Sequence, residues 1–279
     1  MRWVIAFILI CALGIGAWWL TDNQSFYDVI GNYVENGEFV TLEARYTPDQ
    51  IMDTHRQELI ADSQHSFQEP SLKFYPYLLM EVKYMQPDKK TREGVILWSM
   101  VDGEMVLNTE NWEKTHGFED AIAAGATHED FKILNALAKN GGKLSQEQLM
   151  KDLNLEYETL NEWVNNAKQK HLILQKGNEL LLHLQNPKFL VTPQTKITQW
   201  LVTKPYNHAQ RIAKSFSRSQ IEKTAQAAFG HDFTIRNTSE VFLPVYSIEV
   251  LNPDGSILTS YWNALNGQRI YPKYVAEAP

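Results

Sequence analysis

The pattern of apolar and polar residues predicts two similar modules in this 279-residue chain. The first covers residues 40–112 and the second covers residues 216–274. In each, a helix start is followed by two runs rich in aromatic and β-branched residues, which is typical of a hairpin. The strands are expected at 74–84 and 94–100 in the first module, and at 242–251 and 256–262 in the second. Each module is therefore expected to lay one helix on a small antiparallel sheet.

The same residues recur in the same order in both modules, which indicates an internal repeat. The matched residues are Gln50-Ile51-x-x-Thr54 with Gln220-Ile221-x-x-Thr224, Phe74-x-Pro76 with Phe242-x-Pro244, Glu81-Val82 with Glu249-Val250, and Trp98 and Gly103 with Trp262 and Gly267. Large aromatic residues at equivalent strand positions most simply fill equivalent cores. We therefore expect Trp98 and Trp262 to hold equivalent places after superposition.

Helix-capping patterns set the expected start of each repeat. Thr47-Pro48 is a cap residue followed by proline at the first helical position. Ser219-x-x-Glu222 has the spacing of a capping box. Both helices are expected to precede their hairpins directly.

The segment between the modules, residues 127–185, has helical periodicity instead. Capping patterns at Thr127-x-x-Asp130 and Ser145-x-x-Gln148 start two helices, and Leu160, Trp163, Val164 and Ala167 share one face of a third. Gly177-Asn178 then separates two strand-like runs. The order of three helices and a hairpin wing resembles a winged-helix domain.

An uncharged apolar run, residues 3–20, is just long enough to cross a bilayer as a helix, which needs ~20 residues. Arg2 precedes it and acidic residues follow, so the positive-inside rule places the N-terminus in the cytosol and the body outside. The sequence thus predicts a single-pass protein of a bacterial inner membrane. A cleaved signal peptide is the alternative, since Gly14 and Gly16 supply small residues near the end of the run.

Charge and motifs limit the chemistry. The net charge of −7 argues against a general nucleic-acid surface. Within 127–185, seven lysines face eight acidic residues, and Glu156, Glu158 and Glu162 would repel phosphates at the third helix. The single cysteine, Cys11, lies in the apolar run, so the body has no thiol chemistry. No catalytic, metal-binding or cofactor-binding motif is present, and none of these sites is expected.

Positive charge gathers in residues 186–224, of which residues 186–215 are interpreted as a basic linker. Lys204, Arg211, Lys214 and Arg218 are the candidate partner-binding residues, for an acidic protein, an anionic polymer or a membrane surface. The alternative is that these cations balance the acidic stretch at residues 110–120.

The end of the second module, Tyr261-Trp262-Asn263-Ala264-Leu265-Asn266-Gly267, resembles the aromatic-x-Ala-x-x-Gly motif of PepSY-like or cystatin-like units in extracytoplasmic bacterial proteins. The first module departs from the motif, with Met100 where the second has Ala264. The resemblance implies a helix on a curled sheet. It also implies an envelope protein that modulates a cell-wall enzyme or a peptidase by binding.

The sequence therefore predicts an α+β protein with a transmembrane helix and two related helix-plus-sheet modules flanking a winged-helix-like module. The expected function is non-enzymatic binding of a protein or an anionic polymer in the envelope, with no cofactor. Two alternatives stay open: a membrane-tethered winged-helix regulator that binds DNA in the cytosol, and an enzyme with a site between modules.

Overall fold

A computed structural model describes residues 38–60, 62, 64–86, 88–184, 187–205 and 209–271. The chain divides into two units, residues 1–39 with 203–208, and residues 40–202 with 209–279. The second unit contains both repeats and the helical segment between them.

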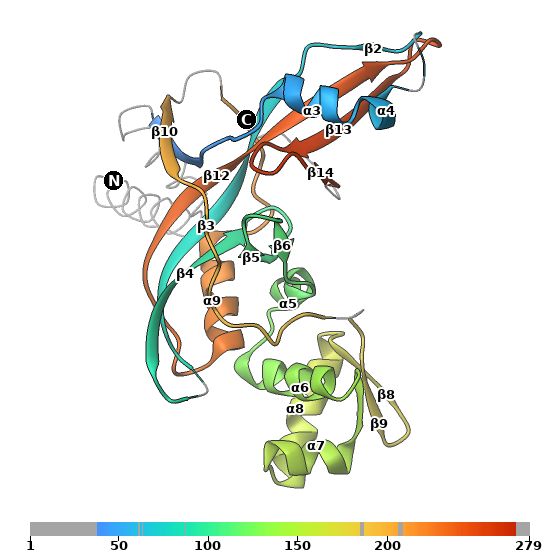
Figure 1. Ribbon diagram of the computed structural model, residues 1–279. Coiled ribbons are helices and arrows are strands. Elements are labelled where there is room, and N and C mark those ends of the chain that lie inside the picture. Colours follow the sequence, from blue (N-terminus) through green and yellow to red (C-terminus); the bar gives the residue numbers. More distant parts are fainter. Residues whose placement is uncertain are drawn as a thin grey trace, which may run out of the picture. The chain divides into compact units, whose positions relative to one another are not determined.

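The elements follow the order expected for two repeats with an inserted segment (Figure 1). The first copy consists of β1 (Glu38–Leu42), α3 (Pro48–Thr54), α4 (Arg56–Leu59), β2 (Ser66–Phe67), β3 (Ser71–Met85), β4 (Thr91–Ser99), β5 (Met105–Asn108) and β6 (Glu113–Lys114). The second consists of β11 (Gln210–Arg211), α9 (Arg218–Phe229), β12 (Thr234–Leu251), β13 (Ile257–Asn263) and β14 (Arg269–Ile270), and is preceded by β10 (Leu201–Pro205).

The long strands of the two copies pair with each other. In the antiparallel ladder of β3 and β12, Phe74 lies opposite Pro244 and Pro76 lies opposite Phe242. Phe74 is the repeat counterpart of Phe242, and Pro76 is the counterpart of Pro244, so each pair is the image of the other. The two strands are therefore related by an approximate twofold axis near the pair Tyr75–Leu243. The structure thus corrects the prediction of two separate modules: both copies belong to one sheet.

The expected equivalence of the two tryptophans is confirmed. Trp98 lies opposite Leu78 in the β3–β4 ladder, and Trp262 lies opposite Tyr246 in the β12–β13 ladder. Leu78 and Tyr246 are counterparts in the repeat. Both indole side chains are fully buried.

The segment leading into each helix bonds to the hairpin of the other copy. The Ala264 carbonyl accepts the N–H groups of Arg45 (2.9 Å) and Tyr46 (3.0 Å), while the Met100 carbonyl accepts those of Ser215 (2.9 Å) and Phe216 (3.0 Å). The four donors are counterparts in the repeat, as are the two acceptors. The short parallel pairings agree, since Thr41 pairs with Phe242 and Arg211 pairs with Phe74.

Apolar packing shows the same exchange of helices between copies (Figure 1). Helix α3 places Ile51 in a core with Ile248, Val250 and Trp262 of the second hairpin. Helix α9 places Ile221 in a core with Met80, Val82 and Trp98 of the first hairpin. Each helix therefore covers the hairpin of the other copy, and separating the copies would expose both cores.

One helix start was predicted correctly and the other was wrong. Thr47 caps α3 through a capping box with Gln50. Helix α9 is capped by Ser217 with Gln220, two residues before the predicted box. Glu222 instead forms an ion pair with Arg218, one helical turn earlier, at 2.7 Å. Its carboxylate therefore does not cap the helix.

The inserted segment has the elements that the sequence predicted. They are α6 (His128–Lys139), α7 (Gln146–Leu153), α8 (Tyr157–Gln169), and the hairpin of β8 (Ile173–Lys176) and β9 (Glu179–Leu182). A short helix α5 (Phe118–Ala123) precedes them, and β7 (Lys143–Ser145) joins the hairpin in the order β7-β9-β8. The core of this segment is continuous with the core under β3, β4 and α9.

The predicted fold class is wrong in its transmembrane helix. Across the ranges that the structure describes, no helix is both long and apolar enough to span a membrane. The run at residues 3–20, on which the prediction rested, lies outside those ranges. The α+β assignment itself is confirmed. The expected location at a bacterial inner membrane stays a prediction.

Candidate partner-binding surface

A buried aromatic cluster joins the inserted segment to the first hairpin. Phe118 of α5 is fully buried and meets Trp98 edge to face, with ring centroids 4.8 Å apart. Its ring also contacts Phe131 of α6 at 5.8 Å and Phe189 at 5.2 Å. Such aromatic pairs add to the stabilisation from buried area. The inserted helices are therefore packed on the first hairpin through a filled core.

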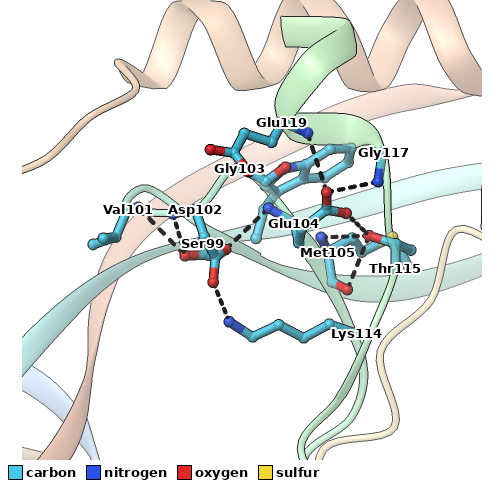
Figure 2. Close-up of polar contacts among 11 residues, drawn as sticks. Ser99, Val101, Asp102, Gly103, Glu104, Met105, Lys114, Thr115, Gly117 and Glu119 are labelled. Carbon is cyan, nitrogen blue, oxygen red and sulfur yellow. Dashed lines mark hydrogen bonds and ion pairs between the residues drawn. The ribbon is translucent and has the colours of Figure 1, made fainter. Parts of the chain in front are cut away.

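A buried carboxylate strengthens the contact between the inserted segment and the first hairpin, here called the joint (Figure 2). Glu104, in the turn after β4, accepts hydrogen bonds from the Thr115 hydroxyl (2.7 Å), the Gly117 N–H (2.8 Å) and the Glu119 N–H (3.2 Å). These bonds tie the hairpin to the start of α5. Burial raises the pKa of Glu104, although the three donors partly oppose that rise. Both carboxylate oxygens are used by protein donors, so Glu104 holds the joint together.

Asp102, in the same turn as Glu104, forms an ion pair with Lys114 of β6 (Figure 2). The Lys114 ammonium is 2.5 Å from an Asp102 carboxylate oxygen and lies over the Tyr77 ring at 5.5 Å. Burial alone would raise the pKa of Asp102, but Lys114 and the Ser99 hydroxyl more than offset it, so the pKa is lowered. Asp102 therefore stays ionised and fastens β6 to the turn.

The second copy has the uncharged counterparts of these two acids. Asn266 replaces Asp102, and Gln268 replaces Glu104. The backbone turn is the same, because the Gln268 N–H donates to Asn266 Oδ1 at 3.0 Å and the Glu104 N–H donates to Asp102 Oδ1 at 3.1 Å. Gln268 is exposed, whereas Glu104 is buried. Sequence analysis predicted only a turn here, and the change from Asp-Gly-Glu to Asn-Gly-Gln was the available signal.

The outer edge of the first hairpin is covered by residues 187–202, here called the edge strap. Thr195 donates its N–H to the Val95 carbonyl at 2.7 Å. Its hydroxyl accepts the Leu97 N–H at 2.8 Å and lies 2.5 Å from the Val106 carbonyl, to which it donates. Thr195 is 4% exposed, so this part of the predicted basic linker is packed against β4 and β5.

The matching edge of the second hairpin is open in the part of the chain that the structure describes. Strand β14 pairs with β13 only at Tyr261 and Trp262. No described segment pairs with the outer side of Ile257–Thr259. Ile257 is 55% exposed and Leu258 is 47% exposed. An apolar strand edge of this kind is a template for pairing with another chain.

The predicted basic residues are only partly brought together. Arg211 and Lys214 lie in the segment that leads into α9, and Arg218 is the first residue of that helix. Lys204 lies in β10 and belongs to the other unit. Lys214 pairs with Glu240 at 2.6 Å, and Arg218 pairs with Glu222 as described above. Carboxylates therefore neutralise Lys214 and Arg218.

Cations of the edge strap are paired as well. Lys188 lies 2.5 Å from Glu113, and Lys196 lies 3.5 Å from Glu110. For these two lysines the alternative interpretation is confirmed: they balance the acidic stretch at residues 110–120.

A cavity of about 630 Å³ lies between α5 and the turn after α8. It is lined in part by His116, His171 and His183. Nδ1 of His183 lies 2.7 Å from the His171 carbonyl oxygen, a contact that fixes its ring. Among the described residues, no group of three or more histidine, cysteine or acidic side chains is arranged to hold a metal ion.

Comparisons with protein-family models, curated proteins and solved structures find no match to this chain. The candidate site therefore rests on the geometry of the described residues.

Proposed function

We propose that this protein is a non-enzymatic binding protein whose partner is another protein. The observation that carries the proposal is the difference between the two hairpin edges. The edge strap covers β4, whereas the exposed apolar edge of β13 is uncovered within the described residues. Since folded proteins normally cover or charge such edges, an uncovered apolar one favours a docking role.

The polar groups of the joint support a binding role over catalysis. Asp102 is paired with Lys114, and both oxygens of Glu104 accept protein hydrogen bonds. A general acid or base must reach a substrate proton. These carboxylates instead connect the inserted segment to the sheet, and aromatic rings fill the space beside them.

A protein partner fits the charges better than an anionic polymer or DNA does. The ion pairs of Lys188, Lys196, Lys214 and Arg218 reduce the positive potential of the predicted basic segment. Glu156, the N-cap residue of α8, and Glu158 and Glu162 within that helix are exposed. Phosphates would be repelled by that helix.

Site-specific photocrosslinking of the full chain in its own cells tests the proposal. A photoreactive phenylalanine analogue replaces one exposed apolar residue at a time, at Met85, Tyr157, Leu174 or Leu258. We expect a discrete light-dependent protein adduct from at least one position, and the strongest adduct from Leu258. Exposed Glu147 is the matched control, at which little adduct is expected. Absence of an adduct at all four positions would contradict a protein-binding function.

A further inference from the structure

The edge strap shows what chemistry fits the outer side of a hairpin in this fold. This inference rests on the proposed function and concerns the same open edge. In the first copy, Thr195 supplies one backbone donor and one hydroxyl, and together these satisfy Val95, Leu97 and Val106. The hydroxyl acts as both donor and acceptor, which a valine side chain cannot do.

The second copy presents the counterparts of all three groups. Thr259 corresponds to Val95, and Tyr261 and Ile270 correspond to Leu97 and Val106. The ladders agree, because Tyr261 lies opposite Ile270 just as Leu97 lies opposite Val106. The N–H and C=O of one residue in an antiparallel strand point to the same side. Thr259 therefore directs both groups to the open edge, as Val95 directs its carbonyl to Thr195.

The change from Gly94 in the first copy to Leu258 in the second limits the size of the side chain that a docked segment can place beside it. Gly94 lies between the Tyr84 ring and the edge strap, because a Cβ added there would be 3.3 Å from a ring carbon of Tyr84 and 3.4 Å from Cγ of Gln194. The counterpart of Gly94 is Leu258, whose side chain needs that space. A segment docking on β13 therefore needs a small residue where the strap has Gln194. Leu258 then fills the volume that the glutamine side chain occupies in the first copy.

We propose that the outer edge of β13, at Ile257–Thr259, binds an extended segment of a partner protein in which glycine or alanine directly precedes threonine. The segment adds a strand to the hairpin, its threonine N–H donating to the Thr259 carbonyl and its hydroxyl reaching Tyr261 and Ile270. Strand addition of this kind takes affinity from main-chain bonds and specificity from side-chain positions.

Two other occupants fit less well. Residues 272–279 contain no threonine or serine, so they lack the short hydroxyl side chain that reaches the edge in the first copy. A second copy of the chain already uses Thr195 on its own β4. A β13-to-β13 pairing would bring together two exposed Leu258 side chains without the small residue.

A peptide titration of the full chain tests the proposal. The probe is a blocked, fluorescent peptide with the sequence of residues 191–198 and the change Gln194→Gly. We expect weak binding, with a dissociation constant on the order of 0.1–1 mM, and amide shifts centred on Thr259 and Tyr261. Replacing the peptide threonine that corresponds to Thr195 by valine should weaken binding about thirtyfold, the effect of two lost hydrogen bonds.

Two variants of the protein sharpen the test. Leu258→Gly should reverse the preference, so that the peptide with glutamine binds more tightly than the peptide with glycine. Thr259→Pro puts a ring carbon in place of the outward N–H, where it blocks a docking strand, and should abolish the amide shift at Tyr261. Proline is tolerated on edge strands, so this variant should stay folded.

Three results would overturn the proposal: no shifts at Thr259 and Tyr261, no change of preference in Leu258→Gly, or edge shifts that depend on protein concentration without peptide. The last would assign the edge to a second copy. Crosslinked adducts at Met85, Tyr157 or Leu174 with none at Leu258 would overturn this inference and leave the proposed function standing.

Discussion

The two copies share a backbone and differ in what is attached to it. Trp98 and Trp262 occupy equivalent buried positions, and Gly103 and Gly267 have φ values of +70° and +69°. The first copy carries acidic groups at the turn, an inserted helical segment and an edge strap, whereas the second has amides and an open edge. The charged residues therefore lie where the fold accepts an insertion. The shared apolar residues mark the fold itself.

The largest expected effects come from the two tryptophans. Trp98→Ala and Trp262→Ala should each lower the free energy of unfolding by about 4 kcal/mol, because each removes a fully buried side chain. Urea unfolding measures both losses. Only Trp98 contacts Phe118, so only Trp98→Ala should raise hydrogen exchange in α6. Equal exchange in α6 for both variants would break the proposed asymmetry.

The buried carboxylate gives the next largest effect. Glu104→Leu leaves two backbone N–H groups without acceptors and leaves the Thr115 hydroxyl only its longer bond to the Met105 carbonyl (3.3 Å). It should cost about 3 kcal/mol in urea unfolding. Glu104→Gln introduces the residue found at Gln268 and should cost less than about 1 kcal/mol, because its amide can face the Thr115 hydroxyl. A glutamine variant as unstable as the leucine variant would show that the joint requires the charge.

The pH dependence follows from the raised pKa of Glu104. A raised folded-state pKa means that the folded protein binds the proton more tightly than the unfolded chain does. Its contribution to stability is complete below the ordinary pKa of about 4.5 and is lost as pH rises through the folded-state value. The difference in the free energy of unfolding between Glu104→Gln and the unsubstituted chain should therefore shift in favour of the variant as the pH rises from 4 to 7. A difference that is constant over this range contradicts the assignment.

The turn glycines should differ by a smaller amount. Gly267→Ala should cost about 1 kcal/mol, because alanine disfavours the left-handed conformation. Gly103→Ala should cost about 2 kcal/mol, since its Cβ would also lie 3.1 Å from the Glu119 backbone. At Gly267 the nearest atoms belong to the Tyr46 ring, at 3.3 Å. Thermal unfolding of the two variants measures the difference. Equal losses of stability would mean that the Glu119 backbone in α5 does not pack closely against Gly103.

The helix caps should give the smallest and most equal effects. Thr47→Ala and Ser217→Ala each remove one capping hydrogen bond, and should each cost about 1 kcal/mol in urea unfolding. Ser219→Ala serves as the control for the second helix and should cost less than about 0.5 kcal/mol. A larger loss of stability in Ser219→Ala than in Ser217→Ala would mean that Ser219 caps the helix, as the sequence predicted.

The sequence predicted elements whose signals are local. Capping boxes, the glycine turns and the aromatic and β-branched run at 242–251 located most helices and hairpins. The local sequence could not show that each helix covers the hairpin of the other copy. Ile51 and Ile221 are the same residue type, and either hairpin offers an apolar face. The first part of β12, residues 234–241, was missed because its polar residues, including Arg236 and Glu240, hide the strand pattern.

The candidate site was less predictable than the fold. Thr195 looks like a linker residue in the sequence, and its three partners come from segments about ninety or more residues away. Glu104 looks like an ordinary turn residue until Gly117 and Glu119 are placed beside it. Both roles depend on long-range contacts, which neither periodicity nor residue spacing reports.

The central claim is that the copies exchange their helices across an approximate twofold axis. Nuclear Overhauser effects between selectively labelled residues of the full chain test it most directly. We predict cross-peaks from the Tyr46 ring to the α protons of Gly267, and from the Phe216 ring to those of Gly103. Cross-peaks from Tyr46 to Gly103 and from Phe216 to Gly267 would mean that each helix covers its own hairpin, and would contradict the account.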